Sequence, residues 1–262
     1  MIARRFLVLG LASCGLMLCA ASAPQYLRRL DAFRVRSVEV TGTNFLEPYE
    51  ALAASGIDST SSVFDDPRAW SGSLLLHPLV EDVRVSRRPP GTVRIHITER
   101  EPVALLRTPT LQPVDRRGQV LPVNPAWRDL DLPVLGGTVE LSSGRVQDAR
   151  IVRTLQGLAS LRTLQPEMWP WISEVSAGGA HMRLLLRWPA GAELLLALPL
   201  EAERLDEVRL VLSDLAAGSP AGAAADTTDP SNDLTRLRRL DARFAEQVVV
   251  SLESGENTRE GG

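Results

Sequence analysis

The sequence contains little cysteine and little histidine. Its two cysteines, Cys14 and Cys19, lie in an apolar N-terminal stretch, so the rest of the chain has no disulfide and no thiolate metal ligand. The three histidines, His77, His96 and His181, are far apart, and none has a partner at metal-ligand spacing. A surface or strand-edge position is favoured for each. The sequence therefore predicts neither a metal centre nor a bound cofactor.

Catalytic motifs are absent as well. The sequence has no Gly-x-Ser-x-Gly elbow and no glycine loop of the phosphate-binding kind. Glu99, Arg100 and Glu101 could suggest acid–base chemistry, but Pro102 follows at once, which favours a solvated hinge between two folded units. We therefore expect a protein that is not an enzyme.

The chain also has no excess of positive charge. It carries 29 basic and 32 acidic residues, a formal net charge of -3, which argues against a general nucleic-acid binder. Its 262 residues can bury one large core or two small ones. Trp127, Trp169, Trp171 and Trp188 could form a sugar-binding platform, but their irregular spacing favours core or interface positions.

What the chain does have begins with an uncharged run at residues 6–23. About 18 apolar residues are near the lower limit for a helix that crosses a bilayer, and an uncleaved anchor at residues 6–25 is the favoured interpretation. A cleaved signal peptide is the second, although Pro24 directly after the small residues 21–23 disfavours cleavage. A lipoprotein signal at Cys14 is the third, and the apolar residues that follow Cys14 argue against it.

Residues 33–101 have the pattern of a small unit of strands and helices. Val38 and Val40 alternate with polar residues, as in a half-buried strand. A first helix is expected between Pro48 and Gly56, because proline suits the first turn and glycine the C-terminal cap.

The two helices predicted here each have an apolar face. In the first helix this face holds Tyr49, Leu52 and Ala53. The second helix is expected to begin after Asp66, with Trp70 and Leu74 one turn apart on its buried side.

Two strands, at residues 83–87 and 93–98, complete this unit around a turn at residues 89–91. The predicted order is strand, helix, helix, strand, strand, with two helices on one face of a three-stranded sheet. Three segments resemble the POTRA domain of the FtsQ/DivIB family of bacterial cell-division proteins: residues 38–42, 77–85 and 90–104. The last segment includes the motif Glu-Arg-x-Pro-Val-Ala. POTRA modules also occur in outer-membrane barrel assembly factors, but this chain is too short to hold the barrel-forming region as well.

The resemblance continues through residues 102–252. It is carried by residues 114–120, 132–136 and 238–250. Periodicity in this region predicts the following elements: a hairpin at 111–121 with a turn at 115–118, helices at 148–163 and 200–215, and strands at 172–176, 181–187, 193–198 and 248–250.

The family resemblance implies an α+β protein. An N-terminal transmembrane helix would be followed by a βααββ POTRA domain at residues 33–101 and a mixed β-sheet domain with flanking helices at residues 102–252. Within the second domain, residues 216–232 are rich in Ala, Gly, Ser and Pro and are interpreted as a flexible insertion. Residues 253–262 are polar and are expected to be disordered.

The resemblance also implies a function. Proteins of this family are division scaffolds that recruit and link other division proteins and connect the cytoplasmic and periplasmic parts of the division machinery. Their C-terminal strand receives a segment of FtsB, which is bound to FtsL, by strand addition at a sheet edge. The residues that would carry this contact are Phe244, Val248, Val249 and Val250, with Phe244 as the apolar anchor. The valines could equally form a plain interior strand.

The POTRA unit is a second candidate surface, since in the family it contacts other division proteins. Its expected edge strands are residues 38–41 and 83–87. A lipid-anchored or periplasmic POTRA protein of outer-membrane assembly is the alternative function, and acylation of Cys14 would distinguish it.

The predicted location is the inner membrane, as a single-pass type II protein. Residues 1–5 would form a short cytoplasmic tail and the C-terminal domain would lie in the periplasm. Arg4 and Arg5 favour an N-terminus inside the cell, whereas Arg28, Arg34 and the arginines beside them conflict with the positive-inside rule. We place the folded domains outside the cytoplasm, because their resemblance to the FtsQ/DivIB family requires this orientation.

Overall fold

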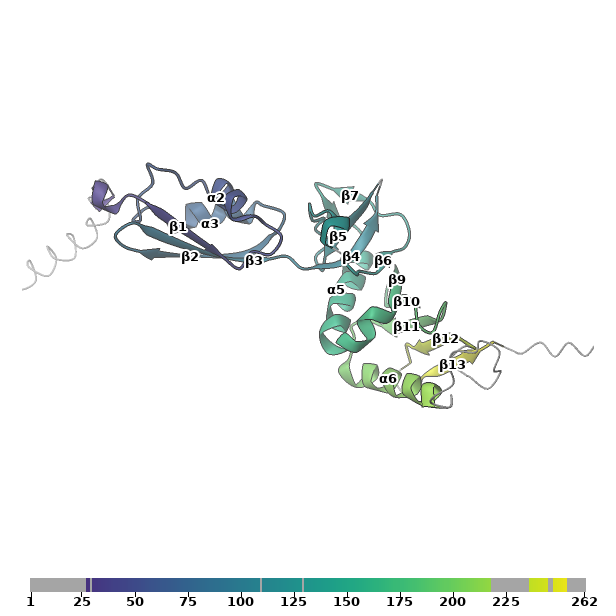
Figure 1. The fold of residues 1–262 in the computed structure, drawn as a ribbon. Helices are drawn as coiled ribbons and strands as arrows, with labels where there is room; N and C mark the ends of the chain where they lie inside the picture. Colours follow the sequence, from purple (N-terminus) through teal and green to yellow (C-terminus); the bar gives the residue numbers. More distant parts are fainter. Residues whose placement is uncertain are drawn as a thin grey trace, which may run out of the picture. The chain divides into compact units, whose positions relative to one another are not determined.

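The computed structural model describes residues 27–28, 30–108, 110–128, 130–217, 236–244 and 247–253 (Figure 1). The chain forms two compact units, Met1–Arg100 and Glu101–Gly262, and divides next to the boundary expected at residue 101.

The predicted membrane anchor at residues 6–25 lies outside the described residues, as do the tail at 1–5, most of the insertion at 216–232 and most of the tail at 253–262. Among the helices that are described, none has both the length and the apolar character that crossing a bilayer requires. The anchor therefore stays a prediction from the sequence.

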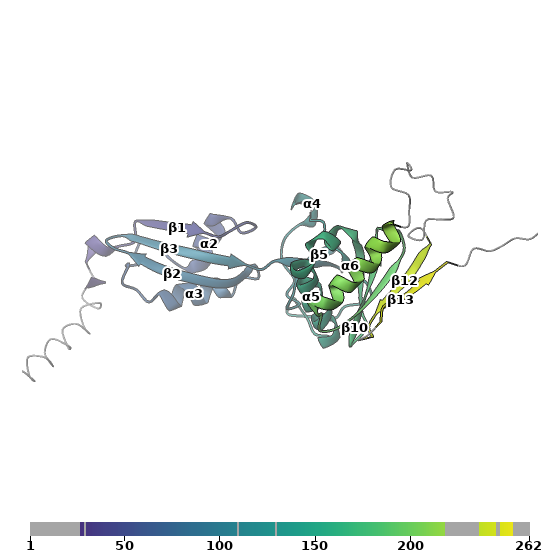
Figure 2. The same ribbon diagram turned by 90° about the horizontal axis from the view of Figure 1, so that it is seen from below.

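The N-terminal unit has the predicted order of strand, helix, helix, strand, strand. Its elements are η1 (Asp31–Phe33), β1 (Ser37–Thr41), α2 (Pro48–Ser55), α3 (Pro67–Leu75), β2 (Val80–Arg88) and β3 (Thr92–Glu99). The sheet order is β1-β3-β2, with β3 parallel to β1 and antiparallel to β2. The two helices lie on one face of this sheet (Figure 2). This confirms the βααββ prediction.

The core of the N-terminal unit lies between the sheet and the helices. Val93, Ile95 and Ile97 alternate along β3 and are buried. Trp70 and Leu74 of α3 are also buried, as their spacing of one helical turn predicts. The carboxylate of Asp66 accepts a hydrogen bond from the backbone N–H of Arg68 at 3.0 Å and caps α3.

The prediction for the buried face of α2 is wrong. Tyr49 and Leu52 are exposed, whereas Ala51 and Ser55 are buried. A helix of eight residues makes only about two turns, so two apolar stripes compete and the periodicity cannot choose between them.

Glu99 also differs from its prediction as part of a solvated hinge. Its carboxylate accepts the backbone N–H groups of Phe45 and Leu46, both at 2.8 Å. The chain turns at Gly42, where φ is +84° and a Cβ atom would lie 2.2 Å from the carbonyl oxygen of Ile97. Glu99 therefore fastens the loop after β1 to the end of β3.

The C-terminal unit is a mixed sheet with helices, as predicted. Its elements are β4 (Pro102–Arg107), β5 (Leu111–Asp115), α4 (Pro125–Arg128), β6 (Val134–Leu135), β7 (Leu141–Ser142), β8 (Arg145–Val146), α5 (Ala149–Leu164), η2 (Pro166–Trp171), β9 (Ile172–Ala177), β10 (His181–Leu186), β11 (Glu193–Ala197), α6 (Ala202–Ala217), β12 (Leu237–Ala242) and β13 (Val249–Leu252). The main sheet has eight strands in the order β13-β12-β11-β10-β9-β6-β4-β5. Three pairs, β4–β6, β6–β9 and β11–β12, are parallel.

The helices α5 and α6 supply the apolar layer that covers one face of this sheet. Asp148 caps α5 by accepting the N–H of Arg150 at 2.8 Å. Both helices bury residues three or four positions apart, as an amphipathic helix must. These residues are Leu155, Leu158, Leu161, Leu205, Val208 and Leu212.

The hairpin predicted at residues 111–121 forms only in part. Its turn is present, because the N–H of Gly118 donates to the carbonyl of Asp115 at 3.0 Å and Gly118 has a φ of +78°. The main partner of β5 is however β4, and Val114 and Val120 form only an isolated bridge. A sequence pattern marks strands but does not choose which strands pair.

Candidate partner-binding site

The strand β13 ends the eight-stranded sheet. It pairs antiparallel with β12, which is its only strand partner in the described part of the chain. Figure 1 shows the two strands side by side in yellow, with no strand drawn beyond β13. One backbone edge of β13 is therefore open to a further strand. Among the described residues, Val249 and Val250 thus lie in an outer strand and not in an interior one.

The register with β12 assigns the side chains of β13 to the two faces of the sheet. Val250 lies opposite Leu240, which belongs to the hydrophobic core under the helices. Val249 lies opposite Asp241 and therefore points to the other face. Val248, just before β13, is half-buried and packs against the core.

Several apolar side chains along this edge are accessible. Phe244 is 47% exposed, Val249 40%, and Val250 and Leu252 37% each. Val250 and Leu252 lie on the core-facing side and are nevertheless more than a third exposed. The structure thus brings the four residues singled out from the sequence to one end of one sheet.

An ion pair lies beside Phe244 at the end of β12. Arg243 donates to both carboxylate oxygens of Asp241, from Nε at 2.9 Å and from Nη2 at 2.6 Å. Its guanidinium carbon also lies 5.9 Å from the centroid of the Phe244 ring, within cation–π range. These hydrogen bonds hold the pKa of the Asp241 carboxyl below its ordinary value, despite the opposing effect of burial.

Arg204 fastens the connection between β12 and β13 to α6. Its Nε donates to the carbonyl of Ala242 at 3.2 Å and its Nη2 to the carbonyl of Gln247 at 2.7 Å. Its guanidinium also pairs with the carboxylate of Glu207. We did not single out Arg204 from the sequence. The available signal was its position four residues before the buried Val208, on the side of α6 that faces the sheet.

The far end of β13 is fastened as well. Arg236 donates to the carbonyl of Glu253 at 2.9 Å, and the N–H of Glu253 donates back to the carbonyl of Arg236 at 2.7 Å. Arg238 pairs with the carboxylate of the same glutamate. Both ends of β13 are thus held in place while its outer edge stays unpaired by any described strand.

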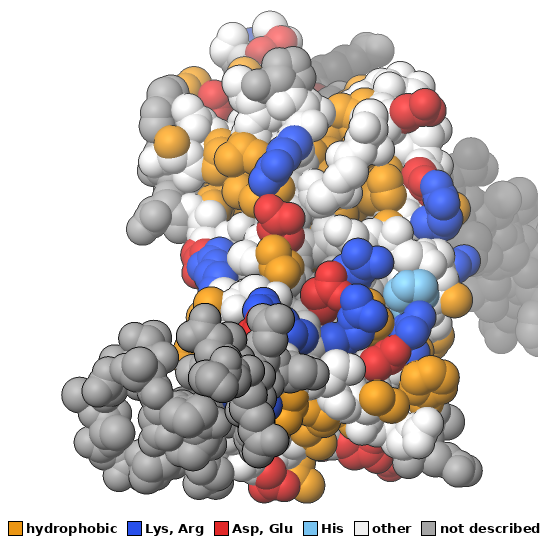
Figure 3. All heavy atoms as spheres, turned by 90° about the vertical axis from the view of Figure 1, so that its right-hand side faces the viewer, with side chains coloured by type: hydrophobic (Ala, Val, Ile, Leu, Met, Phe, Trp, Pro, Cys, Tyr) orange, Lys and Arg blue, Asp and Glu red, His pale blue; other side chains and the backbone are white. Residues whose placement is uncertain are grey.

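The open face of this sheet carries charges of both signs. Glu193 of β11 accepts from Arg239 of β12 at 2.7 Å and lies 3.8 Å from Arg183 of β10. Arg107 of β4 and Glu174 of β9 form a further cross-strand pair at 3.2 Å. Figure 3, which looks onto the side that faces right in Figure 1, shows blue and red side chains next to one another. Such a mixed surface contributes solubility and little net field.

The other candidate residues do not assemble into a chemical site. Within the described residues there is no group of three or more histidine, cysteine or acidic side chains that could hold a metal ion. His77 accepts the N–H of Leu79 at 3.3 Å, and His96 lies 3.2 Å from the hydroxyl of Thr41. Each of these histidines thus has a local structural contact.

The tryptophans also have structural positions. The rings of Trp171 and Trp188 lie 5.4 Å apart at an angle of 58°. Trp169 donates its Nε1–H to the carbonyl of Asp131 at 3.2 Å, and both Trp169 and Trp171 pack against the core. The side chain of Trp127 lies outside the described residues.

Comparison with known proteins extends these observations. Residues 33–100 match the FtsQ-type POTRA domain. A cell division protein FtsQ from Rhodothermus marinus is 29% identical over 240 residues, which cover 88% of this chain and 82% of that protein. Residues 33–100 therefore form an FtsQ-type POTRA domain, and the chain is similar to FtsQ proteins over most of its length.

Other FtsQ proteins match over shorter or more divergent stretches. FtsQ of Chloroflexus aurantiacus is 37% identical over 97 residues, which cover 37% of this chain and 36% of that protein. FtsQ of Geotalea daltonii is 24% identical over 222 residues, or 83% of this chain and 75% of that protein. FtsQ proteins are membrane-associated, non-enzymatic division proteins, and the similarity of this chain to them supports a role in cell division.

Proposed function

We propose that this chain is a division scaffold of the inner membrane that binds an FtsB/FtsL-type partner by strand addition at β13. It would span the membrane once through residues 6–25 and link the cytoplasmic and periplasmic parts of the division machinery. The observation that carries the proposal is the position of β13 as the last strand of the sheet, with one edge unpaired by any described strand.

Strand addition needs a row of backbone N–H and C=O groups that is both accessible and ordered. β13 supports this requirement, because α6 holds its start through Arg204 and β12 holds its end through the contacts of Glu253. A strand fixed at both ends loses little conformational entropy when a partner pairs with it.

The faces of β13 suggest the chemistry of the partner segment. On the core-facing side an added strand would meet Val250 and Leu252, and on the other side it would meet Val249 and Ser251. We therefore expect a partner segment in which apolar and polar residues alternate. Phe244, exposed beside the start of β13, would provide an apolar anchor.

The POTRA unit is proposed as a second surface, for other division proteins. β1 and β2 are the outer strands of its sheet, and each pairs with β3 alone in the described part of this unit. Both strands therefore offer an edge of the kind used in strand addition.

The proposal is tested by proline substitution along β13. Consecutive N–H groups of a strand point in opposite directions, so Val249→Pro and Val250→Pro together remove one outward donor and one donor that faces β12. We expect both variants to lose capture of the purified FtsB–FtsL-type complex, and Phe244→Ala to weaken it by about 2 kcal/mol in calorimetry.

The matched control is Val249→Thr, which keeps the N–H group and the β-branched shape and should bind like the parent chain. Circular dichroism and thermal unfolding establish that each variant is folded. Unchanged capture by both folded proline variants would eliminate β13 as the binding edge.

A further inference from the structure

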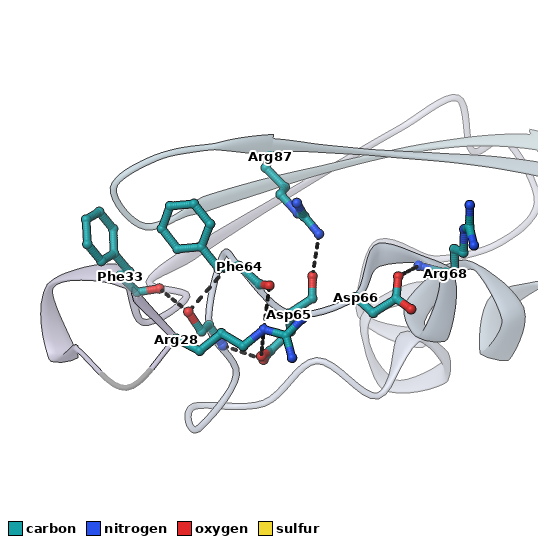
Figure 4. Close-up of polar contacts among 8 residues, drawn as sticks. Arg28, Phe33, Phe64, Asp65, Asp66, Arg68 and Arg87 are labelled. Carbon is teal, nitrogen blue, oxygen red and sulfur yellow. Dashed lines mark hydrogen bonds and ion pairs between the residues drawn. The ribbon is translucent and has the colours of Figure 1, made fainter. Parts of the chain in front are cut away.

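The segment that leads into the N-terminal unit is fastened to it. Arg28 donates from Nε to the carbonyl of Phe64 at 2.8 Å and lies 3.8 Å from the carboxylate of Asp65 (Figure 4). The rings of Phe33 and Phe64 meet edge to face, with their centroids 5.0 Å apart. Residue 28 is thus held against the loop that precedes α3.

Two further contacts continue this attachment to the start of β1. The N–H of Val35 donates to the carbonyl of Ser61 at 2.9 Å, and the N–H of Arg36 donates to the carbonyl of Gly91 at 2.8 Å. Gly91 belongs to the turn between β2 and β3, so the lead-in segment reaches the end of the sheet at which that turn lies.

Five exposed arginines gather at this end of the N-terminal unit. We call them the arginine rim: Arg28, Arg34, Arg36, Arg87 and Arg88. Arg88 lies opposite Thr92 beside the turn, and Arg87 reaches across to donate to the carbonyl of Asp65 at 2.7 Å (Figure 4). The rim therefore combines the lead-in segment with the end of β2.

Positive charge on the rim is only partly compensated. Asp31 pairs with Arg34 at 2.7 Å, and Asp65 with Arg28. By contrast, the guanidinium groups of Arg36 and Arg88 have no partner among the described residues, and Arg87 donates to a neutral carbonyl. The nearby carboxylates of Asp58 and Asp66 accept backbone N–H groups, as an Asx turn and a helix cap; they keep their charge and weaken the positive field of the rim without pairing with Arg36 or Arg88.

The position of the rim in the chain indicates what it faces. Residue 28 follows the expected end of the membrane anchor by three residues, a span of at most roughly 10 Å. Electrostatic attraction between exposed charges decays over about 8 Å at physiological ionic strength, so residue 28 lies within roughly one such length of the headgroups. The sequence has no lysine, and the planar guanidinium of arginine can bind a phosphate through two hydrogen bonds.

We infer that the arginine rim docks the POTRA unit on the anionic phospholipid headgroups of the membrane that holds the anchor. Arg36, Arg87 and Arg88 contact the phosphates, and Arg28 holds the unit close to the point where the chain leaves the bilayer. This also gives the arginines that conflict with the positive-inside rule a role on the outer surface. The inference shares the predicted anchor with the proposed function but not strand addition, which partner capture tests separately.

The test uses the full chain reconstituted in vesicles, with Cys14 and Cys19 replaced by serine. A donor dye is attached through Ser59→Cys, in the loop beside the rim, or through Asn44→Cys, beyond the opposite end of β1. Acceptor dyes are carried by the lipids. We expect energy transfer from the Ser59→Cys site to be higher in vesicles that contain phosphatidylglycerol than in pure phosphatidylcholine, and high salt to remove the difference.

Substitutions distinguish the effect of the rim charge on energy transfer from an effect of misfolding. A triple variant that removes the rim charge should abolish the lipid-dependent rise in energy transfer; its substitutions are Arg36→Gln, Arg87→Gln and Arg88→Gln. Lysine at the same three positions should keep most of the rise. The matched control, Arg84→Gln, Arg107→Gln and Arg145→Gln combined, removes equal charge elsewhere and should behave like the parent. Equal transfer in both lipids, an unchanged rise in the rim glutamine variant, or a chain that does not float with the vesicles would each overturn the inference.

Discussion

Asp241 and Arg243 form a two-point ion pair beside the proposed binding edge, and this pair links Phe244 to the end of β12. The carboxylate of Asp241 also accepts the backbone N–H of Arg243 at 3.1 Å. Three hydrogen bonds to the charged form explain the lowered pKa of Asp241, and they make the pair sensitive to acid.

The first prediction concerns Asp241→Asn. Because the folded pKa of Asp241 is depressed, its contribution to stability is fully present above the unfolded pKa of about 3.9 and is lost as pH falls through the folded pKa. At pH 7 we expect the variant to unfold about 1 kcal/mol more easily, since Arg243 is partly exposed and water screens the pair.

Urea unfolding from neutral to acidic pH measures this effect. The difference in the free energy of unfolding between the parent and Asp241→Asn should become smaller below about pH 4. Asp214→Asn, on the exposed side of α6, is the control and should follow the parent throughout. A gap that stays constant in acid would show that the ion pair is not the cause.

At the scale of elements, α6 holds the residues that lead into β13. The crossover helix α6 connects β11 to the parallel strand β12, which is the arrangement that parallel neighbours require. Because α6 packs over the core, its Arg204 can reach the carbonyls of Ala242 and Gln247. A residue on a helix thus fixes the start of a strand more than 40 positions later.

The second prediction follows from this contact. Arg204→Ala should leave α6 folded, since Leu205, Val208 and Leu212 remain buried, but should release the start of β13. We expect a loss of about 1.5–3 kcal/mol in local stability, the range for hydrogen bonds to a charged group. Hydrogen exchange of residues 249–252 should accelerate, and partner affinity should fall.

The control for this variant is Arg209→Ala on the same helix. Arg209 contacts only Asp206, at 3.9 Å, among the described residues, and such an exposed pair contributes little. Exchange of residues 249–252 should therefore match the parent in the control. Equal protection in Arg204→Ala would show that β12 alone holds β13 in place.

At the scale of the whole molecule, the chain joins a POTRA unit and a larger sheet unit that each bury their own apolar residues. Each unit also has outer strands, and the two units could therefore bind different partners. Two separate binding surfaces are what a scaffold needs, because a scaffold binds several proteins and catalyses no reaction.

The third prediction concerns the cell. Depletion of this protein should produce filaments, because septation fails while growth continues, and microscopy would measure cell length. The parent chain should restore normal length, whereas a chain with Val249→Pro should not. Leakage of the envelope without filaments would instead favour a role in outer-membrane assembly.

Local structure followed from the sequence because its causes are local. Caps at Asp66 and Asp148, the turn at Gly118 and the alternation along β3 each depend on residues within a few positions of one another. The valine-rich segment at residues 248–250 was likewise recognisable as a strand.

Tertiary structure decided what periodicity left open. The buried face of α2, the fastening role of Glu99 and the clamp of Arg204 all depend on contacts between distant segments. The place of β13 at the end of the sheet depends on the order of eight strands, and composition is the same for an edge strand and an interior one. The sequence by itself determined which segments become helices and strands, since hydrogen bonding and side-chain period act locally. Only the folded sheet decided which strand edge is left without a described partner, because strands far apart in the chain compete to pair with one another.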